Sequence, residues 1–203
     1  MALISNGTTV FDAGSMASGF GSSMVFIKKL TASSDATLSF VNGASNVVLD
    51  STYKEYVFTY NSMHPATDSA AFTVGFRDGD TNYDATKTTT HFRAYHQENG
   101  SASALGYYTS GDIAQGTGFQ TINLEVDADA DSCCSGYIHL FNPSDTTFVK
   151  HFIATGNTVQ NDTISRADYV QGYCNVTAAI DAVQFKFSSG NIDSGDICLY
   201  GIS

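Results

Sequence analysis

The sequence predicts an all-β protein, a β-sandwich of the jelly-roll type with an extended N-terminal arm. Three observations support this fold class. Fourteen Phe and eleven Tyr in 203 residues favour strands over helices. Short segments alternate apolar and polar residues, as expected for sheets with one buried face. These segments recur roughly every 8–12 residues between polar turns, which is typical of sandwiches and barrels.

The chain divides into two unequal parts. Residues 1–23 are rich in Gly, Ser, Ala and Thr and lack a sustained period, so we expect an extended arm outside the core. Residues 24–203 contain no linker and no internal repeat, and we expect one β-sandwich domain there. Among double-sheet architectures, the jelly roll is the one expected.

Strand patterns fill the first half of the domain. The expected strands cover residues 24–31, 37–41, 53–63 and 72–76. The second of them ends at Asn42-Gly43, a dipeptide that favours a hairpin turn. A polar loop follows the fourth strand over residues 78–82.

The second half continues in the same way. The expected strands cover residues 88–96, 121–126, 137–141 and 148–153. Asn99-Gly100 closes the first of these, and Asn142-Pro143-Ser144-Asp145 joins the last two in a hairpin or arch. Residues 165–170 have a helix-like spacing of Ser and Asp, but the segment is too short for a stable helix.

The last stretch, residues 179–203, has the clearest pattern. It predicts two strands joined by a polar turn at residues 188–191. Val183, Phe185 and Phe187 share one face of the first strand, and Gln184 and Lys186 share the other. We therefore expect a buried face here and a final strand tied into the sheet.

The charge balance excludes some partners. Charged residues make up 14% of the chain, below the usual quarter, so Ser, Thr, Asn, Gly and Tyr must cover much of the surface. The net charge of −11 and the lack of a basic run argue against nucleic acid binding. No apolar run of about 18 residues predicts a membrane span. The first seven residues lack the pattern of a signal peptide, so we expect synthesis in a cytoplasm.

Neither the cysteines nor the histidines form a recognisable site. Cys133, Cys134, Cys174 and Cys198 lack the spacing of a zinc site, and we expect reduced, packed thiols. The histidines are His64, His91, His96, His139 and His151. His139 and His151 flank the expected Asn142-Pro143 turn and could meet across it, but no third group completes a metal or acid–base site. We expect no cofactor, no metal and no catalytic residue.

Two acidic loops are weak cation candidates. Asp127, Asp129 and Asp131 alternate as in the first half of a calcium loop, but the turn glycine and the final acid are missing. Asp78, Asp80, Asn82 and Asp84 form the second loop. Solvated acidic loops are the simpler interpretation of both.

Exposed tyrosines are the candidate glycan-binding residues. The sequence offers Tyr53, Tyr95, Tyr107 and Tyr108 for such a face, although Tyr on a half-buried sheet more often packs in the protein. A glycan-cleaving enzyme needs two carboxylates at a set separation. The acids of this chain lie mostly in turns, which disfavours that function.

Several segments resemble structural proteins of marine tailed bacteriophages. They are residues 1–9, 26–34, 50–58, 63–68, 187–195 and 199–201. The resemblance runs across nearly the whole chain and implies a virion component with a β-sandwich fold and no catalytic residues. Cys133-Cys134 departs from it, since a polar turn would be usual there.

Three functions follow as hypotheses. The leading one is a non-catalytic virion protein, either a capsid decoration or cement protein or a tail-associated component. It would contact other virion proteins and form a homo-oligomer, as a trimer or another symmetric form. The alternative is a glycan- or receptor-binding module of a tail or head fibre that recognises a host-surface glycan. The third is a glycan-cleaving enzyme on the same fold.

Overall fold

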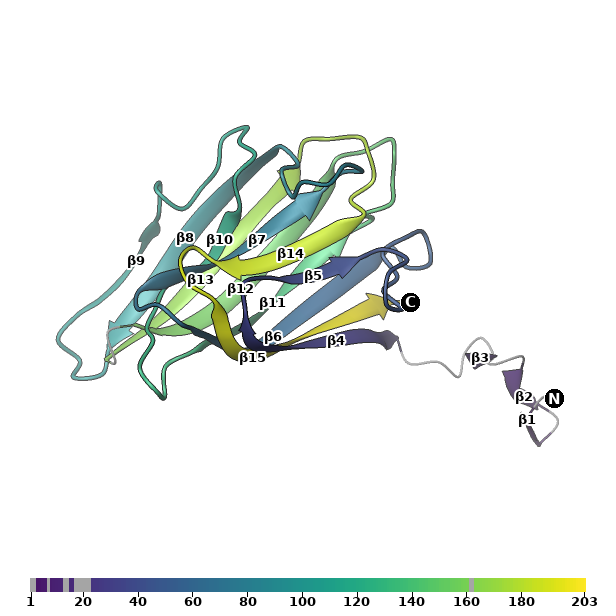
Figure 1. Cartoon of the computed structure of the whole chain (residues 1–203), viewed down its shortest axis with the longest axis horizontal. Coiled ribbons are helices and arrows are strands. Elements are labelled where there is room, and N and C mark those ends of the chain that lie inside the picture. Colours follow the sequence, from purple (N-terminus) through teal and green to yellow (C-terminus); the bar gives the residue numbers. More distant parts are fainter. Residues whose placement is uncertain (1–2, 7, 13–14, 17–22, 161–162) are drawn as a thin grey trace.

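The computed structural model of the chain describes residues 3–6, 8–12, 15–16, 23–160 and 163–203. These residues form strands, turns and loops, and no helix occurs among them. Within this part of the chain there is accordingly no helix that could cross a membrane. Figure 1 shows two packed antiparallel sheets, which confirms the predicted all-β sandwich.

The smaller sheet of the sandwich has four strands in the order β10-β7-β14-β5. Its strands are β5 (Leu38–Val41), β7 (Ala70–Arg77), β10 (Gln120–Val126) and β14 (Ala182–Phe187). The larger sheet has eight strands in the order β4-β15-β6-β11-β12-β13-β8-β9. Its strands are β4 (Met24–Asp35), β6 (Glu55–Pro65), β8 (Lys87–Gln97), β9 (Ser103–Tyr107), β11 (Cys134–Phe141), β12 (Lys150–Gln160), β13 (Ile164–Cys174) and β15 (Ile192–Ile202).

The described part of the expected arm contains three short strands. They are β1 (Leu3–Ser5), β2 (Thr8–Asp12) and β3 (Ser15–Met16), and they form a separate sheet in which β2 pairs with both of the others. Residues 1–2, 7, 13–14 and 17–22 of the expected arm lie outside the described residues. In the part of the chain that is described, β1–β3 have no sheet partner in the sandwich.

The chain passes repeatedly from one sheet to the other. β14 belongs to the smaller sheet and β15 to the larger one, so the polar turn over residues 188–191 is an arch between sheets. β5 pairs with β14 and not with the strand that follows it, so the hairpin expected at Asn42-Gly43 is wrong. A turn does form there, with Gly43 at φ 78°, but the chain then continues into the core through Val47 and Leu49.

Hairpins form at the expected turns at Asn99-Gly100 and at residues 142–145, and residues 165–170 form no helix, as expected for so short a segment. β8 and β9 pair across Asn99-Gly100, where the Gly100 amide donates to the Gln97 carbonyl over 2.9 Å. β11 and β12 pair across residues 142–145. Residues 165–170 lie inside β13, because pairing with β12 on one side and β8 on the other outweighs a weak local preference.

Aromatic side chains fill the core between the smaller sheet and the β4–β11 half of the larger one. Val183, Phe185 and Phe187 of β14 are at most 3% exposed, as the alternation predicted. The Phe185 ring lies 5.6 Å from that of Phe58 on the opposite sheet, centroid to centroid. Each fully buried Phe contributes about 1.5–3 kcal/mol to folding.

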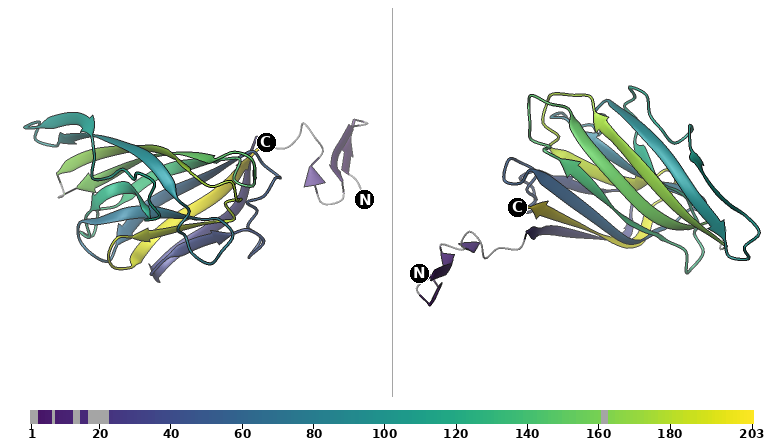
Figure 2. Two further views of the ribbon diagram at one scale, coloured as in Figure 1. Left: turned by 90° about the horizontal axis from the view of Figure 1, so that it is seen from above. Right: turned by 180° about the vertical axis from the view of Figure 1, so that it is seen from behind.

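The larger sheet extends beyond the smaller one. β10, the edge strand of the smaller sheet, packs on β12 and β13. β8 and β9 continue the larger sheet past that edge, and Figure 2 shows their hairpin extending from the sandwich. This overhang positions the candidate site.

Candidate functional site

Charged side chains of β8, β12 and β13 lie on the inner face of the sheet, toward the smaller sheet. Four of them are at most 3% exposed: Lys87, Lys150, Arg166 and Asp168. The Lys87 ammonium donates to the Gly118 carbonyl over 2.8 Å, and the Lys150 ammonium donates to the Thr177 carbonyl over 2.8 Å. Burial lowers the pKa of both lysines. Arg93 lies two residues after the buried His91 on β8, so its side chain is on the same, inner face.

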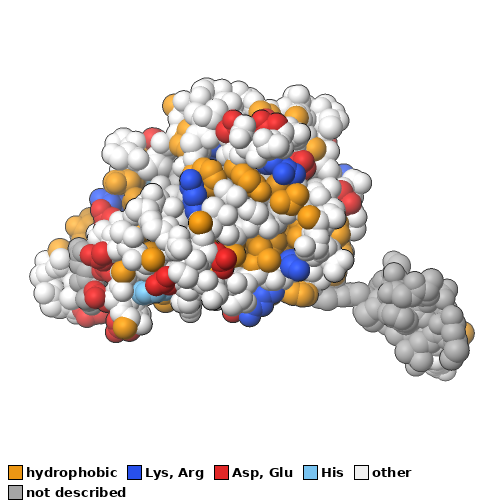
Figure 3. All heavy atoms as spheres, viewed as in Figure 1, with side chains coloured by type: hydrophobic (Ala, Val, Ile, Leu, Met, Phe, Trp, Pro, Cys, Tyr) orange, Lys and Arg blue, Asp and Glu red, His pale blue; other side chains and the backbone are white. Residues whose placement is uncertain are grey.

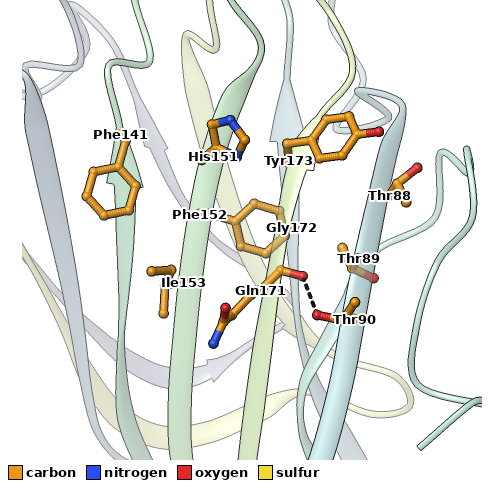
Figure 4. A pocket seen from close by; sticks show the side chains of 10 residues that line it. All are labelled: Thr88, Thr89, Thr90, Phe141, His151, Phe152, Ile153, Gln171, Gly172 and Tyr173. Atoms are coloured by element: carbon orange, nitrogen blue, oxygen red, sulfur yellow. Dashed lines mark hydrogen bonds between the residues drawn. The ribbon is translucent and has the colours of Figure 1, made fainter. Parts of the chain in front are cut away.

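We call the opposite face of β8, β11, β12 and β13 the outer face. It has no Asp, Glu, Lys or Arg, since every such residue of the four strands lies on the inner face. Its large apolar members are Phe92, Tyr137, Phe141, Ile153, Tyr169 and Tyr173. The rings of Phe92 and Tyr169 stack at 4.9 Å. A hollow of about 420 Å³ lies on this face, and Figure 4 shows Phe141, His151 and Tyr173 around it.

A buried hydrogen-bonded pair lies at the centre of the inner face. His91 Nε2 is 2.9 Å from Asp168 Oδ1, and neither side chain has any exposed surface. The second Asp168 oxygen accepts the Leu124 amide of β10. Within the described part of the chain, His91 Nδ1 has no hydrogen-bond partner. The pair joins β8, β13 and β10 and is shielded from any substrate.

Next to this pair, a groove of about 330 Å³ opens between the edge of β10 and the overhanging β8. It is lined by Arg93, Tyr95, Gln97, Tyr108, Glu125, Gln160, Ile164 and Arg166. A second hollow of about 170 Å³ adjoins it, since Arg93 and Tyr95 line both. Tyr107 and residues 104–106 complete the second hollow.

Polar contacts order the groove. Arg166 Nη2 lies 2.7 Å from Glu125 Oε2, and the Gln160 amide donates to the same oxygen. The Arg93 guanidinium lies 4.3 Å from the centre of the Tyr108 ring, within the range of a cation–π contact. Arg166 is 3% exposed, and its Nε and Nη1 atoms have no hydrogen-bond partner. Unpartnered buried guanidinium donors are uncommon and require an explanation.

The backbone at Glu125 is unusual as well. Glu125 has a φ of 49°, in the left-handed region that non-glycine residues seldom adopt. The pairing of β10 with β7 shifts its register between Asn123 and Val126. Such bulges often occur beside functional sites.

The structure brings together three of the four candidate tyrosines. Tyr95, Tyr107 and Tyr108 all line the groove or its adjoining hollow. Tyr53 does not join them; its ring packs against Tyr56 at 5.7 Å. Sequence reasoning missed the other lining residues, because they come from β8, β10, β12 and β13. The alternation along β8 could have predicted three of them together, since Arg93, Tyr95 and Gln97 share one face of that strand.

The histidines do not form a cluster within the described part of the chain. The β11–β12 register places Ile153 opposite His139, so the expected His139–His151 pair does not form. His139 contacts Glu55 of β6 instead, and His151 packs near Tyr173. Their positions agree with polar groups held in a hydrogen-bonded sheet.

In one of the two acidic loops, three carboxylates lie close together. Single oxygens of Asp78, Asp80 and Asp84 lie within 4.8 Å of one another, and across the described residues no other acid, His or Cys belongs to such a group. Asp127, Asp129 and Asp131 are therefore not gathered, and Asp127 is only 3% exposed. An exposed acidic cluster alone does not define a metal site.

The four cysteines are free thiols. Cys134 and Cys174 have no exposed surface, and burial raises the pKa of the Cys174 thiol to about 12. Burial raises the pKa of Cys134 well above its usual value too. Such thiols are neither nucleophiles nor ready metal ligands near neutral pH.

The surface shows no single basic patch on the face drawn in Figure 3, where Lys and Arg side chains lie in small separate groups.

Comparison of the chain with protein-family models, with curated proteins and with solved structures gives no match.

Proposed function

We propose that the protein is a non-enzymatic structural component of a tailed-phage virion, which assembles through the outer face of β8, β11, β12 and β13. The neighbours on this face are other virion proteins, major capsid or tail proteins, and further copies of the chain in a symmetric oligomer such as a trimer. A capsid decoration or cement protein and a tail-associated component are the two forms of the proposal. The protein acts in the virion after synthesis in the host cytoplasm.

The absence of charge on the outer face carries the proposal. In a monomeric protein, charged side chains normally point to water, whereas the Lys, Arg and Asp residues of these strands point inward and large apolar side chains lie on the outer face. Ile153 and Tyr137 are 38% and 41% exposed on this face. Contiguous exposed apolar surface is typical of protein contact sites. The net charge of −11 lies elsewhere on the molecule, so it does not oppose close packing on this face.

The strand order supports a jelly-roll assignment. When β4, β5, β6, β7, β10, β11, β14 and β15 are numbered one to eight, the sheets contain the orders 1-8-3-6 and 2-7-4-5. This interleaving supports a jelly roll, an architecture found in viral capsid and lectin domains. The β8–β9 and β12–β13 hairpins are additions that widen one sheet. Fold alone does not establish function, so this argument only supports the outer-face observation.

Purified virions and one pair of variants test the proposal. Mass spectrometry should detect the wild-type protein in the particles. Ile153→Glu should fold and melt like the wild type but fail to enter particles or oligomers, because a charge on a packed face must be desolvated. Ser51→Glu, on an exposed loop, is the matched control and should incorporate normally. Absence of the wild type from virions, or normal incorporation of Ile153→Glu, would refute the proposal.

A second candidate function is a glycan- or receptor-binding module of a tail or head fibre. The groove beside β10 favours it, because aromatic and hydrogen-bonding side chains converge there. Among the described residues that line the groove, Glu125 is the one carboxylate, and it is engaged by Arg166. A glycan-cleaving mechanism with two carboxylates therefore has less support. A glycan array with multivalent protein tests for binding.

A further inference from the structure

We infer that the groove between β10 and the β8–β9 hairpin binds a saccharide that bears a carboxylate. This inference rests on the second candidate function, glycan recognition, and specifies its ligand. It is independent of whether the protein is part of a virion.

The first argument is the positive charge of Arg166. This side chain is almost completely buried, yet two of its guanidinium nitrogens have no partner. It lines the groove, and its third nitrogen is fixed by Glu125 at 2.7 Å. The two unpartnered nitrogens are themselves buried, so the anchored guanidinium acts on a ligand in the groove through its positive charge, which favours a carboxylate.

The second argument is the balance of charge. Glu125 is paired with Arg166, whereas within the described part of the chain the Arg93 guanidinium contacts the Tyr108 ring and forms no salt bridge. The carboxylate opposite Arg93 in the β8–β13 register, Asp168, is fully buried and does not line the groove. Among the described residues that line the groove, two arginines accompany one carboxylate, in a protein with a net charge of −11. A local positive site in an acidic protein favours one anionic group over a neutral ligand.

The third argument concerns shape and chemistry. Tyr95 and Tyr108 provide aromatic surface for the apolar side of a sugar ring, while Gln97 and Gln160 provide amides for hydroxyl groups. The two adjoining hollows share Arg93 and Tyr95, so the site is elongated along the β8–β9 hairpin. A simple inorganic anion would use none of this aromatic and amide surface, but a saccharide would use all of it.

The test is a binding panel with the full-length chain. The probes are trisaccharides of galacturonate, mannuronate and guluronate and sialyl-lactose, each with its methyl ester, together with sodium acetate. Isothermal titration or ligand-observed NMR measures binding. At least one acidic saccharide should bind at least about tenfold more tightly than its ester, as expected for the loss of a charged hydrogen bond. Acetate should bind far more weakly than that saccharide.

Two variants locate the site. Arg93→Gln removes a positive charge from a partly exposed position and should weaken binding of the acidic saccharide at least about tenfold without unfolding the protein. Arg77→Gln is the control, since Arg77 pairs with Asp181 at the other end of β7 and should leave binding unchanged. Tyr95→Ala should weaken saccharide binding more than acetate binding.

The outcomes separate the proposals. If no acid in the panel binds, or if acids and esters bind equally and Arg93→Gln has no effect, the inference is wrong. Equal binding of acid and ester would still leave glycan recognition in place. Acetate binding as tight as the saccharide would also overturn the inference, because the site would then recognise a bare anion. Virion mass spectrometry is unaffected by any of these results.

Discussion

At the scale of single residues, the core depends on a few aromatic side chains. Phe185 has no exposed surface, and its ring contacts those of Phe40, Phe58 and Phe72. We expect Phe185→Asp to prevent cooperative folding, because an unpaired carboxylate in this cluster costs several kcal/mol. Gln184→Asp, one residue away on the other face of β14, should still fold. A thermal melt of both variants is the measurement, and a cooperative melt of Phe185→Asp near the wild-type temperature would contradict the assignment.

The acidic cluster gives a second prediction at this scale. Asp78, Asp80 and Asp84 offer few oxygens compared with the six to eight that calcium prefers, so cation binding should be weak at most. Melting in millimolar calcium and in chelator should therefore give midpoints that differ by less than about 10 °C. Asp80→Asn should reduce whatever difference remains. A larger shift that disappears in Asp80→Asn would reveal a true metal site.

At the scale of elements, turns are fixed by side chains that cap backbone amides. In the β11–β12 hairpin, the Asp145 carboxylate accepts the Thr147 and Phe148 amides over 2.6 and 2.7 Å. These hydrogen bonds, with the Phe148 amide first, lower the pKa of Asp145. A carboxyl group whose pKa is lower in the folded state stabilises the protein above its unfolded pKa of about 3.9. That stability is lost as the pH falls through the lower folded value.

The lowered pKa of Asp145 gives a prediction for the pH dependence of stability. At pH 7, Asp145→Ala should melt below the wild type, because the amides lose their charged acceptor. The difference between the two midpoints should shrink as the pH drops below about 4, where the wild-type carboxyl is protonated as well. Melting curves from pH 7 to pH 3 measure it. A difference that stays constant down to pH 3 would mean that the ionised form of Asp145 does not matter.

At the scale of the whole molecule, the sandwich does not use β1–β3 as sheet partners. β4, the strand that follows them, pairs with β15 along its length. Deleting residues 2–22 should therefore leave the melting midpoint of the sandwich within a few degrees of the wild type, while it weakens incorporation into particles or oligomers. Thermal melts and particle mass spectrometry measure the two effects. An unfolded deletion variant would show that the arm stabilises the core.

The core itself differs between the two ends of the sandwich. Between the smaller sheet and the β4–β11 half of the larger one it is aromatic. Under β8, β12 and β13, buried polar side chains such as Lys87, Lys150 and Asp168 lie among apolar ones such as Phe152 and Val170. Tyr60 links the two regions, because its hydroxyl donates to Asn123 over 2.6 Å, and the Asn123 amide donates to Thr158 over 2.8 Å. Burial raises the pKa of Tyr60 well above its usual value, so this donor keeps its proton. Satisfied buried polar networks of this kind specify one arrangement of the strands.

Strand identity was largely predictable from the sequence, but burial on β10 was only partly so. The alternation of Ile122, Leu124 and Val126 correctly predicted an apolar side, yet Asn123 between them has no exposed surface either. The reason is the irregular pairing of β10 with β7, which breaks the simple two-residue period. The Asn42-Gly43 turn failed as a hairpin for a related reason, since a local dipeptide does not specify which sheet receives the next strand.

The sequence by itself determined the all-β class, the buried face of β14 and the turns at residues 99–100 and 142–145, because these depend on local periodicity and turn chemistry. Only the tertiary structure decided which strands became neighbours. It placed Arg93, Glu125 and Arg166 from three strands around one groove, and it turned the charges of β8, β12 and β13 inward. Those outcomes depend on long-range pairing and on where one sheet stops covering the other, and neither is encoded in the spacing of neighbouring residues.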